Sequence, residues 1–300
     1  MVKILIFLMP FLQLQCYEYV IAICSVFKDE APWLKEWIEY HKILGVSHFR
    51  LYNNESSDNY LEVLAPYINS GEVMLLDWPN EDGDLTDWAC LRQWPACING
   101  LVNLKNIAKW VALIDIDEFI LPIEDYDLIA FLEKYEEYPA LVLNWQCFGT
   151  SHIVHIPNDK LMIEALTRKA KEFSKLNKPV KSIVRPEFVN LEKRAWAPHT
   201  VSYLGNQMAV FPDKVFRKET LDQSQWEIHP DKCIINHYVH RTEDFFWNQK
   251  LAKKKDMKNW SCLKNSTFVK KWHSDCNKIE DTRILRFASQ LKKTMGFPEK

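Results

Sequence analysis

The sequence predicts an α/β fold in which a mostly parallel sheet is flanked by helices and followed by a polar helical extension. From residue 19 to about residue 145, short apolar runs alternate with segments of helical periodicity, which is typical of β-α-β units. Polar clusters follow several of the apolar runs, as expected where parallel strands end at a ligand site. From residue 242 onward the segments are polar and helical in pattern.

Composition indicates an ordinary globular protein. Of the 300 residues, 47% are hydrophobic and 26% are charged, which suits one sizeable domain with an appended region, or two small domains. The net charge of −2 gives no general attraction to nucleic acid, and no nucleic-acid-binding motif is present, so that class is set aside. Twelve Trp residues are many; most are expected in the core, but such a surplus also suits stacking on sugar faces.

Residues 1–16 are expected to be a signal sequence or a short hydrophobic leader. The apolar run from Ile4 to Leu14 is too short to span a bilayer, and the small-residue cleavage pattern is poor. This leader favours a membrane-associated or secretory location over a cytoplasmic one. The cysteines include no C-x-x-C pair, which disfavours structural zinc, and Cys262 and Cys276 could form a disulfide if the chain is exported.

The first strand and helix have clear signals. The apolar run YVIAICSVF, residues 19–27, predicts the strand. Pro32 suits the first position of the next helix and Gly45 suits its end. One face of this helix is formed by Leu34, Trp37, Ile38, His41 and either Ile43 or Leu44.

The next elements repeat this order. SHFRLYN at 47–53 predicts a strand, YLEVLAPYI at 60–68 a helix, and EVMLLDW at 72–78 a third strand. TDWACLRQW at 86–94 is expected to be a helix that Pro95 interrupts.

The stretch WVALIDIDEFILP, residues 110–122, is predicted to be a strand that carries three carboxylates. In a continuing strand, Asp115 and Asp117 would share one face and Glu118 would point to the other, away from any ion. Two carboxylates about 4 Å apart repel by roughly 4 kcal/mol at an effective dielectric near 20, so a cation between them is expected. Hard oxygen ligands suit Mn²⁺ or Mg²⁺, and His237 in the late run IINHY is a possible third ligand.

The remainder of the chain is expected to complete one catalytic domain, residues 17–255, with residues 256–300 as the helical extension. A helix at 128–135 and a strand at 140–145 end the alternating half. Shorter runs then follow and are expected to complete the sheet and build the acceptor side: KSIV, HTVSYL and IINHY. The Lys-rich residues 251–258 predict a solvated helix face, with peripheral membrane contact as the alternative.

Polar residues follow the first two strands and point to a shared ligand. Lys28, Asp29 and Glu30 follow the first, and Asn53, Asn54 and Asp58 follow the second. Each could merely cap a helix, but clusters converging on one edge of a parallel sheet favour a binding site.

Six blocks together resemble the glycosyltransferases of family 92, which are related to family 2 and adopt the GT-A fold, a Rossmann-like sheet. The blocks are ICSVFKDEAPWLKEWIEYHKILGV, FRLYNNESSDNYLEVLAPYI, WVALIDIDEFILP, NWQCFGTS, VKSIVRP and INHYVHRTEDFF. The resemblance implies a metal-dependent hexosyltransferase that acts with inversion. It would move a sugar from a nucleotide-sugar donor, a UDP-sugar with UDP-galactose as one candidate, to a glycan or glycoconjugate acceptor.

The resemblance also implies roles for residues. Asp115 and Asp117 match the D-x-D pair that holds Mn²⁺ or Mg²⁺ against the donor diphosphate, with Asp117 the direct ligand, and His237 matches the C-terminal histidine of that site. The expected nucleotide-sugar-binding residues are Lys28, Glu30, Asn53, Asn54, Asp58 and Asp115. Amides replace two family 2 aspartates at Asn53 and Asn54, which leaves the base preference open. Trp145 is expected on the acceptor side.

An inverting transfer needs a carboxylate that deprotonates the acceptor hydroxyl. The candidates in the second half are Glu187, Asp213, Glu227 and Asp231. Two other functions stay open: a carboxylate-metal nucleotidyltransferase or phosphohydrolase, and a non-catalytic glycan-binding relative. No second strand offers a partner Asp for a two-metal site, which disfavours the first. Intact Asp115, Asp117 and His237 disfavour the second.

Overall fold

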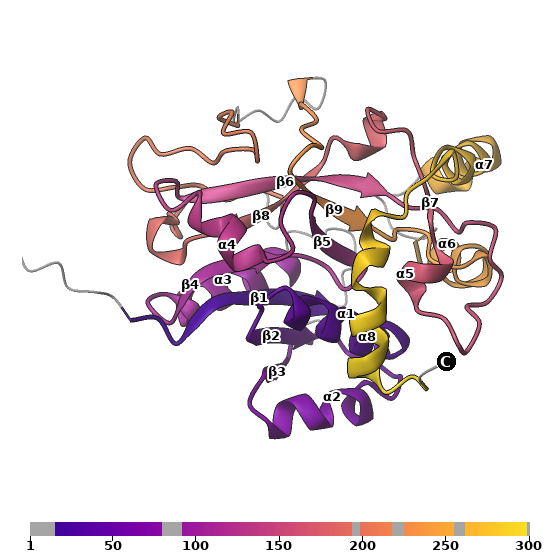
Figure 1. The fold of residues 1–300 in the computed structure, drawn as a ribbon, viewed down its shortest axis with the longest axis horizontal. Coiled ribbons are helices and arrows are strands. Elements are labelled where there is room, and N and C mark those ends of the chain that lie inside the picture. Colours follow the sequence, from indigo (N-terminus) through magenta and orange to yellow (C-terminus); the bar gives the residue numbers. More distant parts are fainter. Residues whose placement is uncertain (1–15, 80–91, 194–198, 218–224, 255–261, 299–300) are drawn as a thin grey trace, which may run out of the picture.

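The computed structural model describes residues 16–79, 92–193, 199–217, 225–254 and 262–298 (Figure 1). Eight strands form the main sheet: β1 (Tyr19–Phe27), β2 (His48–Asn53), β3 (Val73–Asp77), β4 (Ala108–Leu113), β5 (Glu118–Pro122), β6 (Ala140–Cys147), β8 (Val180–Val184) and β9 (Cys233–His237). Their spatial order is β3-β2-β1-β4-β8-β6-β9-β5. A small second sheet pairs β7 (Arg168–Lys169) with β10 (Ile279–Glu280).

The expected fold class, a mostly parallel sheet flanked by helices, is confirmed. Strands β3, β2, β1 and β4 run parallel, and β6 is parallel to β9. Strand β8 enters antiparallel between β4 and β6, and β5 is antiparallel to β9 at one edge. The second half of the chain therefore completes the sheet, as expected.

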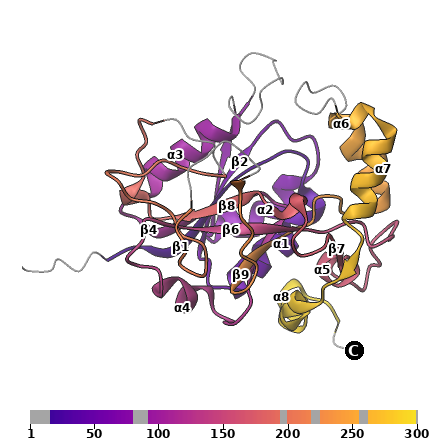
Figure 2. The same ribbon diagram turned by 90° about the horizontal axis from the view of Figure 1, so that it is seen from above.

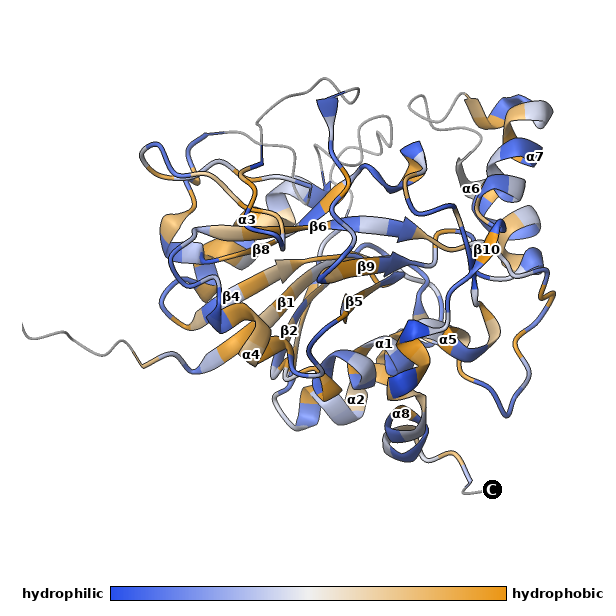
Figure 3. Cartoon of the chain, turned by 45° about the horizontal axis from the view of Figure 1, so that its top comes forward, coloured by the Kyte–Doolittle hydropathy of each residue, from blue (hydrophilic) through white to orange (hydrophobic). Residues whose placement is uncertain are grey.

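Helices cover both faces of this sheet (Figure 2). One apolar cluster joins the sheet to α1 (Ala31–Ile43), α2 (Tyr60–Asn69), α4 (Leu128–Glu133) and α8 (Ala288–Met295), and a second joins the other face to α3 (Trp94–Leu104). Figure 3 shows apolar residues concentrated along the strands, whereas α8 is largely polar on the outside. No helix in the described ranges is long and apolar enough to cross a membrane.

Helix α1 fixes the edge strand β5. The Trp37 indole nitrogen donates to the Glu118 carbonyl over 2.8 Å, and the Tyr40 hydroxyl donates to the Ile120 carbonyl over 2.7 Å. His41 accepts from the Ile120 N–H at Nε2 and donates from Nδ1 to the Trp37 carbonyl. An edge strand otherwise presents unpaired backbone groups, so these side chains complete its hydrogen bonding and set the position of Glu118.

The C-terminal segment packs against the α/β body. Helix α7 (Ser266–Asp275) joins a third apolar cluster with Cys147 and Phe246. Asp281 pairs with Lys169 at 2.9 Å, and Arg286 donates to carbonyls of residues 122, 123 and 125. Cys262 and Cys276 are both free thiols, so the disulfide considered from the sequence is not formed. The leader, apart from Cys16, lies outside the described residues.

Two expectations about secondary structure are wrong. Residues 110–122 do not form one strand: β4 ends at Leu113, a turn follows, and β5 begins at Glu118 on the opposite side of β9. Pro95 does not interrupt a helix but lies in the first turn of α3, where its missing N–H breaks no hydrogen bond. Most of the helix expected at 86–94 lies outside the described residues.

Candidate active site at the carboxylate turn

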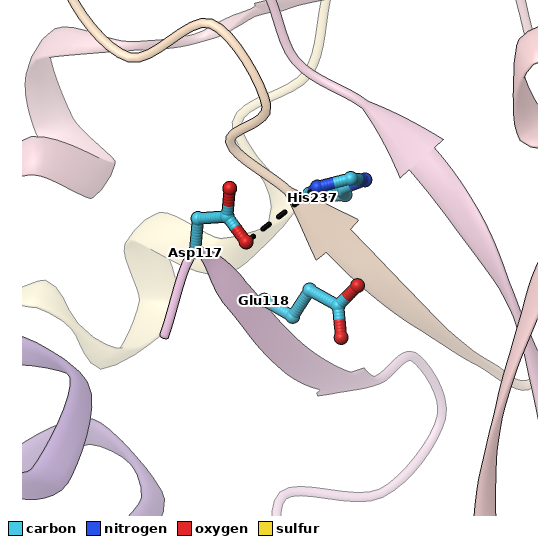
Figure 4. Close-up of side chains that lie close together, drawn as sticks. All are labelled: Asp117, Glu118 and His237. Carbon is cyan, nitrogen blue, oxygen red and sulfur yellow. Dashed lines mark ion pairs between the residues drawn. The ribbon is translucent and has the colours of Figure 1, made fainter. Parts of the chain in front are cut away.

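The turn between β4 and β5 presents the three carboxylates. Because β4 and β1 are parallel, this turn lies at the edge of the sheet where β1 and β2 also end. The Tyr238 N–H donates to the Asp117 carbonyl over 2.8 Å, which ties the turn to the end of β9. Asp117 and His237 are thereby brought together from segments far apart in the sequence (Figure 4).

Asp117, Glu118 and His237 form a group that could hold a metal ion. One ligand atom from each lies within 4.8 Å of the others, and it is the one such group found in the described residues. His237 Nε2 is 3.5 Å from Asp117 Oδ1. Ligands of one Mn²⁺ or Mg²⁺ ion are about 3–4 Å apart, so the group fits an ion after a small contraction. The buried Oε1 of Glu118 has no hydrogen-bond partner in the described structure, which supports that fit.

The expectation that Glu118 turns away from the ion site is therefore wrong. It rested on a continuing strand, whereas the turn after Leu113 brings Glu118 beside Asp117 and His237. Glu118 is fully buried, and its Oε2 accepts from the Asp115 N–H over 2.9 Å. Burial raises the pKa of Glu118 well above its usual range, although Lys181 opposes the shift.

Asp115 lies outside this three-residue group. Its carboxylate accepts from Gln93 over 2.8 Å and from the buried Lys181 over 2.7 Å. Burial alone would lower the pKa of Lys181, but the carboxylates of Asp115 and Glu118 outweigh burial and raise that pKa. Asp115 is paired within the chain, so its expected role as a metal ligand stays a prediction that the geometry does not favour.

Asp117 is held ionised by its neighbours. Burial would raise the pKa of Asp117, but His237 and Lys250 hold it well below the usual range. The Lys250 ammonium lies 3.7 Å from Asp117 Oδ2 and donates to the Val239 carbonyl. Burial lowers the pKa of His237, against the opposing effect of Asp117.

Glu30, which follows β1, forms an ion pair with Arg241 in the same region. Arg241 is 1% exposed, its φ is 54°, and its guanidinium lies over the rings of Trp33 and Phe245. Burial raises the pKa of Glu30 to about 7, against the opposing effect of Arg241. Lys28 is exposed, with its ammonium 4.0 Å from Glu55.

The polar residues after β2 have structural partners. The Asn53 amide donates to Tyr60 and Asp77 and accepts from the Ser56 N–H, and Asn54 donates to the Trp78 carbonyl. These contacts leave the Asn53 amide little capacity to read a base.

Asp58 joins the loop after β2 to helix α1. Its Oδ2 accepts from the Ala31 N–H over 2.8 Å, so it caps α1 from another loop. Its buried Oδ1 has no partner among the described residues. That atom keeps Asp58 a candidate for nucleoside contact.

Trp145 lies against the metal group. Its ring centroid is 4.3 Å from that of His237 and 5.4 Å from that of His199. Burial and then Lys181 lower the pKa of His199 to about 4. The expected place of Trp145 beside the site therefore agrees with the geometry, whereas its contact with an acceptor stays a prediction.

Two candidates for the base, Asp231 and Glu187, lie toward the opposite end of the sheet from the carboxylate turn. Asp231 precedes β9 and His237 ends it, and the five residues of β9 alone cover about 13 Å. Glu187 follows β8, which runs away from the carboxylate turn, and it accepts from Tyr17 before β1. Neither can reach an acceptor bound beside Asp117.

The other two base candidates share one histidine. His229 lies 2.7 Å from Asp213 and 3.3 Å from Glu227, and its ring stacks on Phe211 at 4.0 Å. Both carboxylates stay candidates for the base.

Sequence reasoning missed three cations of this site: Lys181, Arg241 and Lys250. Lys181 had a local signal, since a lone Lys inside the apolar strand VKSIV is rarely buried without a carboxylate partner. Lys250 had none, because it reaches the site from a π-helix, Phe245–Lys250, that periodicity does not reveal.

Comparisons with known proteins bear on the family of the chain. The model of glycosyltransferase family 92 matches residues 17–295. A family 92 protein of Ricinus communis is 23% identical over 274 residues, covering 87% of this chain and 40% of the relative. The galactan β-1,4-galactosyltransferase GALS3 of Arabidopsis thaliana is 30% identical over 132 residues, covering 42% of this chain and 26% of the relative. The chain thus spans less than half the length of these relatives.

Among solved structures, S. aureus TarS 1–349 in complex with UDP-GlcNAc is similar with a TM-score of 0.39 and 15% identity. That alignment covers 69% of this chain and 61% of TarS 1–349.

Proposed function

The chain belongs to glycosyltransferase family 92, and on that premise we propose that it is a GT-A type, cation-dependent hexosyltransferase with a UDP-sugar donor. The acceptor is a glycan or glycoconjugate, and the transfer inverts the anomeric carbon. The observation that supports this best is the convergence of Asp117 and His237, with Glu118, at the edge where β1, β2 and β4 end. Ligands of open parallel sheets bind at that edge.

Asp117, His237 and Glu118 would hold the cation, Mn²⁺ or Mg²⁺. When bound, such an ion stabilises the charge that grows on a departing diphosphate. Asp117 serves this purpose as an anion because its neighbours keep its pKa low. His237 contributes a neutral nitrogen.

The remaining side chains position the reactants. Lys181 neutralises Asp115, so the turn keeps its shape without an ion at that carboxylate. Trp145 presents its ring beside His237, where an acceptor sugar can stack while its hydroxyl approaches the anomeric carbon. Asp213 or Glu227 would take the proton from that hydroxyl.

Galactose is the donor sugar that we propose. Two relatives, GALS3 and GALS2 of Arabidopsis thaliana, are named galactan β-1,4-galactosyltransferases. A β-1,4-galactan oligosaccharide is accordingly the acceptor to test first. We also propose a membrane-associated or secretory location, which the apolar leader supports.

The test is a panel of nucleotide sugars incubated with and without Mn²⁺ and with galactan oligosaccharides. We expect UDP release and elongation of the oligosaccharide only with UDP-galactose and a divalent cation, and a product of inverted anomeric configuration by NMR. Equal turnover in excess chelator would refute cation dependence. Release of phosphate without a glycosylated product would instead favour a phosphohydrolase.

A further inference from the structure

Lys250 shares a carboxylate with the group that would hold the cation. Its side chain is about nine-tenths buried, with Nζ 3.7 Å from Asp117 Oδ2. The same ammonium donates to the Val239 carbonyl. Lys250 ends the π-helix Phe245–Lys250, and π-helical turns are frequent at functional sites.

The two other buried cations of the site have carboxylates of their own. Lys181 lies 2.7 Å from Asp115 and 3.4 Å from Glu118. Arg241 is paired with Glu30. Lys250, by contrast, donates to the Val239 carbonyl and lies near the Asp117 carboxylate, which also contacts His237.

This position makes the ammonium a competitor of the cation. An ion held by Asp117 and His237 and the ammonium of Lys250 would draw on the same carboxylate in a buried, weakly screened place, and their like charges repel. A diphosphate that binds together with the ion offsets this repulsion, since its oxygens attract both the ion and the Lys250 ammonium. The effect of Lys250 on cation binding therefore depends on whether the diphosphate is present.

We propose that Lys250 couples cation binding to diphosphate binding. In the empty site its ammonium balances Asp117 and opposes a divalent cation that arrives alone. When the donor binds, the ammonium pairs with the diphosphate and the cation takes Asp117. This inference rests on the proposed function, since it assumes a nucleoside diphosphate donor.

The experiment measures two affinities by calorimetry: Mn²⁺ without nucleotide, and UDP in excess chelator. For Lys250→Met, which removes the charge and keeps the length, we expect Mn²⁺ alone to bind about 10-fold more tightly and UDP alone about 10-fold more weakly. Lys250→Arg keeps the charge and should preserve the wild-type ratio of the two affinities. If Lys250→Met does not fold, Lys250→Gln, which removes the charge but keeps a hydrogen-bond donor, takes its place.

Lys169→Met is the matched control, because Lys169 is also a buried lysine but pairs with Asp281 outside the site. Neither affinity should change in that variant. The proposal is overturned if Lys250→Met leaves both affinities unchanged, or weakens both together with a lower melting temperature. A wild-type protein that binds neither UDP nor Mn²⁺ with UDP would instead refute the proposed function itself.

Discussion

The ammonium of Lys181 lies 2.7 Å from Oδ2 of Asp115, on a lysine side chain that is 1% exposed. Asp117, two residues further along, contacts His237 and Lys250 instead. The two aspartates of the D-x-D pair therefore have different partners. Asp115 is paired within the protein, whereas Asp117 belongs to the group that could hold a metal ion.

This division predicts different effects of removing each charge. Asp117→Asn should fold normally and lose activity by about 100-fold or more, because it removes the carboxylate that would hold the cation. Asp115→Asn leaves Lys181 with one carboxylate fewer and should lower the free energy of unfolding by about 1–3 kcal/mol. Urea unfolding and steady-state kinetics of both variants test this. Loss of Mn²⁺ affinity in Asp115→Asn as complete as in Asp117→Asn would contradict it.

The link between α1 and β5 predicts a stability effect at a distance from the catalytic chemistry. Tyr40 is fully buried and donates to the Ile120 carbonyl, so Tyr40→Phe leaves that acceptor unpaired. We expect a loss of about 1–2 kcal/mol in the free energy of unfolding. Tyr126→Phe is the control, since Tyr126 is 65% exposed and should change nothing measurable. An unchanged urea midpoint for Tyr40→Phe would show that this hydrogen bond does not secure the edge strand.

The C-terminal segment should contribute stability at neutral pH that is lost in acid, through Asp281. Burial would raise the pKa of Asp281, but Arg283 and Lys169 lower it to about 2, against 3.8 without partners. Because the folded pKa is the lower one, this contribution of about 2 kcal/mol is present above pH 4 and is lost as pH falls from about 4 to 2. Asp281→Asn should be less stable at pH 7 and should lose less stability across that acid range. Parallel stability curves for the two proteins would argue against this role.

The features predicted from the sequence are those with local signals. The β-α-β alternation follows from the periodicity of apolar residues, with Gly45 and Gly71 at helix ends where φ is positive. The convergence of Asp117 and His237 was expected from the resemblance and from the rule that ligands bind where parallel strands end. Trp145 was placed beside them for the same reason.

The features missed depend on contacts between distant segments. Residues 110–122 are apolar enough to be predicted as one strand. In the structure the strand ends at Leu113, and Trp37 and Tyr40 hold β5 at the edge of the sheet by hydrogen bonds that the local sequence does not reveal. That break decides which carboxylates meet: Glu118 joins Asp117, and Asp115 turns to Lys181. Sequence spacing alone predicted that Asp115 and Asp117 lie together and that Glu118 points away. That prediction assumes one continuous strand, in which side chains alternate between the two faces.

The last prediction concerns the role of Trp145 on the acceptor side. Its indole lies 4.3 Å from the His237 ring, between centroids, and its Nε1 is buried with no hydrogen-bond partner in the described structure. Trp145→Phe keeps an aromatic face but reduces its area and removes that donor, so the acceptor should lose stacking while the donor site keeps its contacts. We expect the KM for the acceptor to rise about 10-fold, while donor hydrolysis without acceptor stays within about twofold of the wild type. If both rates fall together with the melting temperature, Trp145 is a packing residue, and the acceptor must bind elsewhere, with the region of His199 and Trp226 as the next place to test.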